Sequence, residues 1–169
     1  SEYTSNIEDF IIKKNPIVFG LNTQKMINEK LINYRVVCNL FRILTDKKKY
    51  KKIKNKLIIP FERQSKEIKK YFNKQKVLNF DLEIVPNKYK FNKDSVVIPN
   101  SLVVSYVLGI AASGKVKKII LAGFQGYDSD DLRQIEMDNT INLFKSNSKI
   151  LISSITPTKY KVKIDSLYV

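Results

Sequence analysis

The sequence contains no histidine and only one cysteine, Cys38, in 169 residues. A single thiol excludes an internal disulfide and fits the reducing cytoplasm. Because zinc sites are built mainly from cysteine and histidine, we expect neither a metal site nor a cofactor. The same absence argues against a metal-dependent aldolase within this chain. No lysine lies inside an apolar stretch that would lower its pKa for Schiff-base chemistry.

Long hydrophobic runs are absent as well. No apolar run approaches the roughly 20 residues that a membrane-spanning helix needs. The first ten residues, SEYTSNIEDF, lack the charged and then apolar pattern of a signal peptide. We therefore expect a cytoplasmic protein with no membrane partner. The chain begins with Ser1 rather than Met, which indicates a processed product or a piece of a longer protein.

Acidic residues are few, with 16 Asp and Glu against 31 Lys and Arg, which gives a net charge of +15. One interpretation is a nucleic-acid surface, but such surfaces favour Arg, which is scarce here. We favour a second interpretation, the codon usage of an A+T-rich genome, with no nucleic-acid partner. The basic stretch from Arg42 to Lys76 is then a solvated face. In either case the surface attracts anions, including nucleotides and phosphorylated sugars.

The stretch of residues 95–131 predicts a strand, a helix and a second strand. Asn100 or Ser101 can cap the helix, and Gly114 can end it by adopting the left-handed conformation. Ile119–Ala122 is short and continuously apolar, as expected for a strand buried on both faces. A strand-helix-strand unit of this length predicts a right-handed parallel crossover within one sheet.

Shorter patterns flank this unit. Residues 1–14 are interpreted as a linker or docking segment, and residues 15–169 as one domain. Apolar runs bounded by turn residues predict further strands at 16–23, 34–39, 56–60, 76–80 and 149–154, with 161–169 as a tail or an edge strand. Together these elements predict an α/β protein, a three-layer Rossmann-like domain with a mainly parallel central sheet flanked by helices.

Helices are expected at residues 24–32, within 67–73 and from Asp128 to Phe144, and residues 81–94 are expected to form a loop. The last helix should bury one apolar side, made of Leu132, Ile135, Met137, Ile141 and Phe144. Acidic residues around its start, from Asp128 to Asp138, offset the partial positive charge of a helix amino end. The same acids could bind Mg²⁺ or Ca²⁺, but they lack the spacing of a calcium loop, so we favour the helix start.

Ligands of open parallel sheets bind at the carboxyl ends of the strands, and here several predicted strand ends carry glycine or polar residues. We expect these ends to converge beside the start of the central helix. The candidate ligand-binding residues are Gly20, Asn22, Thr23, Asn39, Asn100, Ser101, Gly123, Gln125, Tyr127, Thr156 and Thr158. Simpler interpretations stay open. Gly20 fits a plain tight turn as well as a phosphate-binding helix start, and Asn39 can satisfy a local turn.

At these residues the chain resembles the sialyltransferase-like Rossmann domains of bacterial surface-glycan synthesis, over residues 15–168. The matching pieces, in chain order, are Gly20-Leu21-Asn22, Val37-Cys38-Asn39, Asn100-Ser101, Lys118 to Phe124 with Tyr127, and the strand before Pro157. A closer similarity is to the C-terminal domain of aldolases from lipopolysaccharide or capsule loci, through LAGFQGYDSDDLRQIEM and SITPTKY. The resemblance implies that Asn22 and Asn39 contact the nucleotide of a CMP-sugar, and that Ser101 contacts its phosphate or sugar.

Two departures from that family bear on activity. The first turn, FGLNT, is poorer in glycine, and the family's histidine general base has no counterpart. Losing a general base typically costs about 10²- to 10⁴-fold in rate. We therefore expect a non-catalytic accessory domain that binds a nucleotide, nucleotide-sugar or sugar acid, with an upstream aldolase domain as partner. The alternatives are an active CMP-sugar-dependent glycosyltransferase and a structural or homo-oligomerisation domain with a decayed site.

Overall fold

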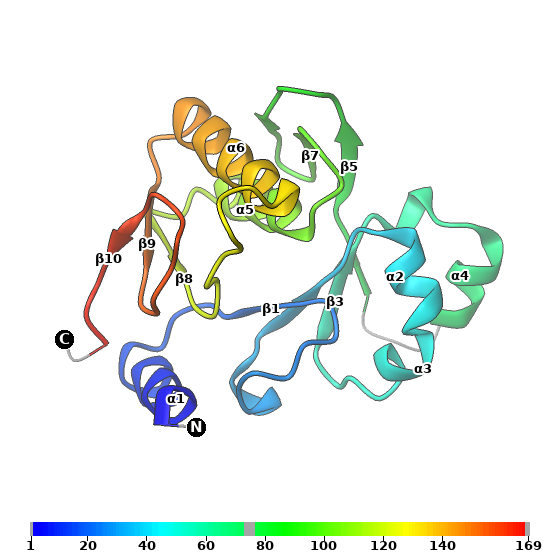
Figure 1. The fold of residues 1–169 in the computed structure, drawn as a ribbon. Helices are drawn as coiled ribbons and strands as arrows, with labels where there is room; N and C mark the ends of the chain where they lie inside the picture. The colour runs from blue at the N-terminus through cyan, green and yellow to red at the C-terminus, as the bar shows by residue number, and fades with distance from the viewer. Residues whose placement is uncertain (1, 73–76, 168–169) are drawn as a thin grey trace.

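Short, mostly parallel strands flanked by helices make up the computed structural model, which describes residues 2–72 and 77–167 (Figure 1). This arrangement confirms the predicted α/β class with Rossmann-like layering. The described strands are divided among three sheets rather than joined in one. The strands cannot join in one sheet because both edges of the strand at residues 95–98 are already paired with other strands.

The first sheet is entirely parallel, in the order β1-β2-β3-β4. Its strands are β1 (Phe19–Leu21), β2 (Tyr34–Val36), β3 (Lys56–Ile59) and β4 (Val77–Asn79). All four lie inside the stretches that apolar patterning predicts, although Lys76 lies outside the described residues. The helices α2 (Leu40–Thr45), α3 (Lys47–Tyr50) and α4 (Lys66–Phe72) pack beside this sheet, at the right of Figure 1. A separate apolar cluster joins them, made of Val37, Ile43, Tyr50, Leu57, Ile59, Ile68 and Phe72.

The other two sheets carry the second half of the chain. One is parallel, in the order β10-β9-β8, and comprises β8 (Lys118–Leu121), β9 (Leu151–Ser154) and β10 (Lys163–Ile164). The other has the order β5-β7-β6, with β5 (Asp81–Ile84) parallel and β6 (Lys90–Phe91) antiparallel to β7 (Ser95–Ile98). The helices α5 (Val103–Ser113) and α6 (Leu132–Asn147) pack over them and share a core that includes Val96, Ile98, Tyr106, Leu108, Ile141 and Phe144.

The predicted crossover between β7 and β8 within one sheet is wrong. Strand β7 pairs with β5 on one edge and with β6 on the other, so no edge remains for β8, which pairs with β9 instead. The same contacts correct the prediction that residues 81–94 form a loop, because pairing with the apolar β7 draws two polar segments into strands. Strand β8 is not buried on both faces either, since Ile120 is 37% exposed.

The predicted helix at residues 24–32 is also wrong. This segment is an irregular loop that contains one short 3-10 helix, η1 (Glu29–Leu31). The cause is Arg35, a buried residue of β2 whose guanidinium Nη1 donates to the carbonyl oxygen of Gln24 at 2.6 Å. The buried guanidinium also binds Glu29, so tertiary contacts hold this segment at two points and override its local pattern.

The helix ends differ in detail from the predictions. Gly114 follows α5 but has a φ of −76°, and the left-handed conformation is adopted by the next residue, Lys115, with a φ of 54°. In α6, Met137, Ile141 and Phe144 are buried as predicted. Leu132 and Ile135 are 80% and 45% exposed, and the polar residues Gln134 and Thr140 take buried positions instead. These two polar residues hold neighbouring loops, as described below.

The first residues form helix α1 (Glu2–Lys14). Ile7 is buried, and Glu8 accepts a hydrogen bond from the backbone N–H of Asn28 at 2.6 Å. The residues after position 160 provide β10 as an edge strand, while residues 168 and 169 lie outside the described part. Within that part, no helix combines the length and apolar character needed to cross a membrane. A second short 3-10 helix, η2 (Phe61–Arg63), connects β3 to α4.

Candidate functional site

The loops that follow β1, β2, β8 and β9 meet around the start of α5, and we call this region the strand-end rim. Cys38, just after β2, donates a long sulfur hydrogen bond to the carbonyl oxygen of Ser101. Gly123, after β8, donates its N–H to the hydroxyl of Thr156, after β9, at 2.9 Å. A Cβ added at Gly123 would lie 2.5 Å from the sulfur of Met26 in the loop after β1. The predicted convergence of strand ends therefore exists, although it joins two different sheets.

The loop after β1 is organised by Arg35, which sequence reasoning did not select. Its side chain is 1% exposed and makes a two-bond contact with the carboxylate of Glu29, with Nε to Oε1 at 3.0 Å. A Cβ at Gly20 would lie 2.8 Å from Nη1 of Arg35, so Gly20 leaves room for the guanidinium. Gly20 lies within β1, and the first described helix after it is η1. A helix start beside Gly20, one of the two interpretations that the sequence left open, is therefore not present among the described residues. An arginine inside the otherwise apolar run YRVV was the signal that could have revealed this contact.

Asn22 and Thr23 lie in the same loop but differ in what their side chains do. Asn22 has a φ of 50° and donates its N–H to the carbonyl oxygen of Val36. Its side-chain oxygen is buried and has no hydrogen-bond partner in the described structure. Thr23 donates its hydroxyl to Asp46 at 3.1 Å. Asn22 thus offers an unused acceptor, whereas the Thr23 hydroxyl is occupied.

Asn39 caps helix α2, because its side-chain oxygen accepts the N–H of Arg42 at 3.2 Å. Its structural role is therefore the local one that the sequence left open. Next to it, burial raises the pKa of the Cys38 thiol to about 12. A thiol of that pKa stays protonated near neutral pH, so Cys38 is not a competent nucleophile.

Asn100 and Ser101 lie at the end of β7, and only Asn100 is committed to the fold. The oxygen of Asn100 accepts bonds from the N–H of Leu102 and the hydroxyl of Ser105, and its nitrogen donates to Thr140 of α6 at 2.8 Å. Asn100 thus ties the start of α5 to α6. Ser101 is exposed, and its hydroxyl makes no hydrogen bond with any described residue.

The loop after β8 is held by hydrogen bonds at Gln125 and at Tyr127. Gly123 and Gly126 have positive φ angles of 79° and 92°. The backbone oxygen of Gln125 accepts the N–H of Lys159, and the N–H of Tyr127 is bound by the side chain of Gln134 at 2.8 Å. The Tyr127 ring is covered on one face by a guanidinium, with the carbon of Arg133 4.1 Å from its centroid. The buried glutamine of α6 therefore positions this loop.

The last candidates follow β9. Thr156 is buried, and its hydroxyl is used by Gly123. The hydroxyl of Thr158 accepts the N–H of Tyr160 at 3.2 Å. Both threonines therefore shape the rim by accepting backbone N–H groups.

The acidic residues before α6 serve the helix start. Asp131 caps α6 by accepting the N–H of Arg133, and that guanidinium lowers the pKa of the Asp131 carboxyl. Asp128 pairs with Lys159 at 2.7 Å. Among residues 2–72 and 77–167, no group of three or more acidic or cysteine side chains is placed to hold a metal ion. The acids are thus arranged as ion pairs and a cap.

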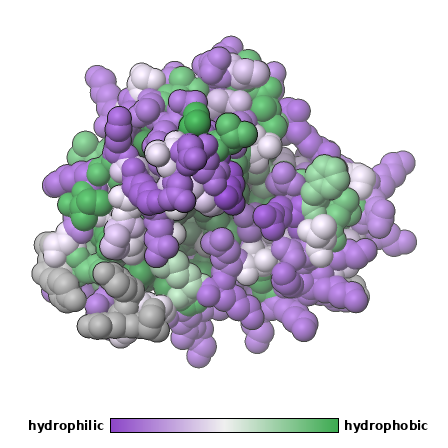
Figure 2. Space-filling view, in the orientation of Figure 1, coloured by the Kyte–Doolittle hydropathy of each residue, from purple (hydrophilic) through white to green (hydrophobic). Residues whose placement is uncertain are grey.

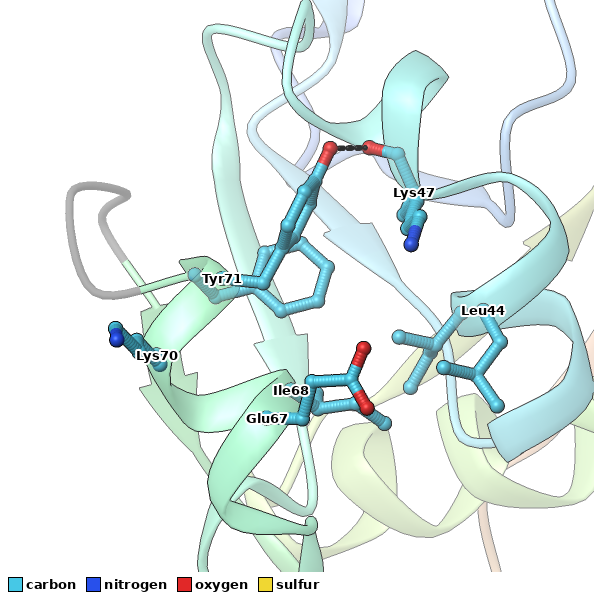
Figure 3. A pocket seen from close by; sticks show the side chains of 8 residues that line it. Leu44, Lys47, Glu67, Ile68, Lys70 and Tyr71 are labelled. Carbon is cyan, nitrogen blue, oxygen red and sulfur yellow. Dashed lines mark hydrogen bonds between the residues drawn. The ribbon is translucent and has the colours of Figure 1, made fainter.

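Two cavities of the described structure are lined mainly by residues outside the rim. The smaller, of ≈ 200 Å³, lies between α2 and α4, with Ile68 and Phe72 as apolar lining and Lys47, Lys70 and Glu67 at its margin (Figure 3). There the hydroxyl of Tyr71 donates to the backbone oxygen of Lys47 at 2.6 Å. The larger, of ≈ 550 Å³, lies between α6 and the ends of β5 and β7. We call it the asparagine cleft, after Asn87, Asn100, Asn139 and Asn142 in its lining.

Of the eleven candidate residues, Asn100 lines the asparagine cleft, and the other ten line neither of these two cavities. The remaining candidates lie on the rim, apart from Gly20, which lies within β1. Comparison of the chain with models of protein families, with curated proteins and with solved structures found no match. The resemblance to sialyltransferase-like domains therefore stays a prediction, and the geometry of the rim and the cleft carries the argument about function.

Proposed function

We propose that this chain is an accessory binding domain that holds an anionic sugar compound at the strand-end rim. The compound is a nucleotide, a nucleotide-sugar such as a CMP-linked one, or a sugar acid. The observation that carries the proposal is the convergence of the loops after β1, β2, β8 and β9 beside the start of α5. Parallel α/β folds bind ligands at this edge, because backbone N–H groups and short polar side chains gather there.

Two groups on the rim are available to such a ligand. Ser101 is exposed, and its hydroxyl bonds to none of the residues that the structure describes. The side-chain oxygen of Asn22 is buried without a described partner. A buried acceptor without a partner costs free energy, and a ligand N–H or O–H would relieve that cost. The net charge of +15 supports an anionic ligand by raising its local concentration.

The groups around the rim do not favour catalysis by this chain. A general base at neutral pH needs a pKa near that pH. Histidine is absent, the pKa of Asp131 is lowered by Arg133, and the pKa of Asp46 is lowered by Lys49. Any catalytic step is then carried out by another domain or another protein. We place this domain in an aldolase-like enzyme of surface-polysaccharide biosynthesis, lipopolysaccharide or capsule, as the resemblance implies.

The first test is a thermal-shift and calorimetric screen with CMP, CDP, UDP, their sugar conjugates and sialic-type acids. A ligand at 100 times its Kd stabilises the native state by about 2.7 kcal/mol. For a chain of this size that raises Tm by roughly 5–10 °C. Ser101→Ala should weaken binding without changing the Tm of the free protein, since its hydroxyl makes no described bond. Ser5→Ala, an exposed serine of α1, is the matched control and should bind normally. No stabilisation by any compound would contradict the proposal.

A second candidate function, homo-oligomerisation, is favoured by one exposed apolar surface. Leu40, Phe41 and Leu44 of α2 are 46%, 77% and 39% exposed. Figure 2 shows a hydrophobic area at the place of α2, on the right, with hydrophilic surface beside it. Phe41→Ser should convert a dimer to a monomer in sedimentation velocity while leaving ligand binding intact. A wild-type chain that is monomeric at high concentration would exclude this role.

A further inference from the structure

The asparagine cleft is a cavity apart from the loops of the rim, and its lining differs in charge from the chain as a whole. Its ≈ 550 Å³ lie between one face of α6, the turn at Pro86 and Asn87 after β5, and the residues Pro99 and Asn100 after β7. Small-molecule sites typically occupy about 300–1,000 Å³. The cleft is therefore large enough for one or two sugar-sized units.

The charge of the cleft lining indicates what kind of ligand fits. Lysine and arginine make up 31 of the 169 residues, yet neither type occurs among the cleft's lining residues, and Glu136 is its charged member. An anion would find no countercharge there and would be repelled by Glu136. A cation, in turn, is disfavoured by the net charge of +15 of the chain. The cleft is therefore suited to an uncharged ligand, unlike the one that we propose for the rim.

The polar groups of the cleft are suited to hydroxyl groups. Each asparagine amide offers two donors and one acceptor oxygen, so it can accept from one hydroxyl and donate to another. The side-chain amides of three residues make no hydrogen bond with other described residues, which leaves them available to a ligand: Asn87, Asn139 and Asn142. The rings of Pro86 and Pro99 and the side chain of Leu143 add apolar surface for the C–H face of a pyranose.

One wall of the cleft is already fixed to the other. Asn100 donates to the hydroxyl of Thr140 at 2.8 Å, and Thr140 donates to the backbone oxygen of Glu136 at 2.8 Å. The first bond holds α6 against the residues after β7, and the second lies within α6 and fixes the orientation of the Thr140 hydroxyl. A site whose walls are fixed before binding loses less conformational entropy when the ligand enters.

We infer that the asparagine cleft binds a neutral sugar residue, a hexose, 6-deoxyhexose or N-acetylhexosamine unit. This inference rests on the cleft alone and does not depend on the ligand of the rim. A domain with both sites would hold an anionic sugar compound and a neutral glycan unit on either side of the β7–α5 junction at Asn100 and Ser101.

Saturation-transfer NMR and calorimetry with a panel of neutral monosaccharides and short neutral oligosaccharides test the inference on the full chain. The test variant is Asn139→Ala with Asn142→Ala, since both positions are exposed on α6 and alanine favours a helix. The control is Asn147→Ala on the same helix, whose side chain donates to Leu143 and does not line the cleft. We expect saturation transfer to at least one neutral sugar, with Kd raised at least tenfold in the double variant and unchanged in the control.

Two results would overturn the inference. One is the absence of binding by every neutral sugar in the panel at millimolar concentrations. The other is neutral-sugar binding that survives in the double variant but is lost in Ser101→Ala, which would assign the sugar to the rim. The rim proposal fails separately, if the wild-type chain binds none of the nucleotides, nucleotide-sugars and sialic-type acids of the first screen. Unchanged circular dichroism and Tm in each variant show that binding, and not folding, is affected.

Discussion

Replacement of Arg35 by methionine probes the contact that decides the shape of the rim. In the native chain the guanidinium is 1% exposed, makes two bonds to Glu29 and donates to the carbonyl oxygen of Gln24. Breaking a buried ion pair by removing one partner typically costs about 3–5 kcal/mol. The side chain of Glu29 is 36% exposed and can rehydrate, so we expect the lower end, about 3 kcal/mol.

Urea unfolding followed by far-UV circular dichroism measures this loss, and thermal unfolding should show Tm lowered by roughly 6–12 °C for a chain of this length. Arg133→Met is the matched control, because Arg133 is exposed and its pair with Asp131 is worth about 0–1 kcal/mol. Ligand binding at the rim should weaken in Arg35→Met as well, since the loop of Asn22 loses its anchor. A destabilisation below about 1 kcal/mol, equal to that of the control, would refute the assignment of Arg35 as the organiser of this loop.

Three further predictions follow from single contacts. Gly123→Ala places a methyl group against Met26 at a residue with a φ of 79°, and should lower the free energy of unfolding in urea by about 1–3 kcal/mol. Adding Met26→Ala should restore only part of this loss, because the backbone strain remains. The ion pair with Lys118 lowers the folded-state pKa of Asp165. The contribution of this pair to the free energy of unfolding is therefore present above the unfolded pKa and is lost as pH falls below about 4. In Asp165→Asn the acid side of the profile of stability against pH should flatten, and an unchanged profile would argue against the pair. Burial raises the pKa of Cys38, so alkylation by iodoacetamide at pH 8 should be far slower in the native protein than in urea, and equal rates would contradict its burial.

Much of the strand pattern was predictable because it depends on local signals. The apolar runs before Asn39 and Pro60 became β2 and β3, and the run after Asn100 became α5. The gathering of strand ends was also predictable, since parallel strands present their carboxyl ends at one edge. What the candidate side chains do there was not. Thr23, Asn39, Asn100, Thr156 and Thr158 are occupied by contacts within the protein.

The asparagine cleft was not predictable from the sequence, apart from Asn100. Its lining comes from the turn after β5, the end of β7 and one face of α6, which lie far apart along the chain. The side chains of Asn139 and Asn142 carry no motif, and asparagine is abundant throughout the sequence. Only the packing of α6 over the end of β7, held by Asn100 and Thr140, brings these amides together.

The sequence by itself determined the α/β class, the main strands and helices, and the edge where strand ends gather. These features follow from apolar runs, from helix-length patterns and from glycine or polar residues at their ends, all of which act over a few neighbouring residues. The tertiary structure decided which strand edges pair, that residues 81–94 supply two strands, and that residues 24–32 form a loop around Arg35. The physical reason is that strand pairing and a buried guanidinium depend on partners distant in the sequence, whose contacts outweigh local preference once the chain is packed.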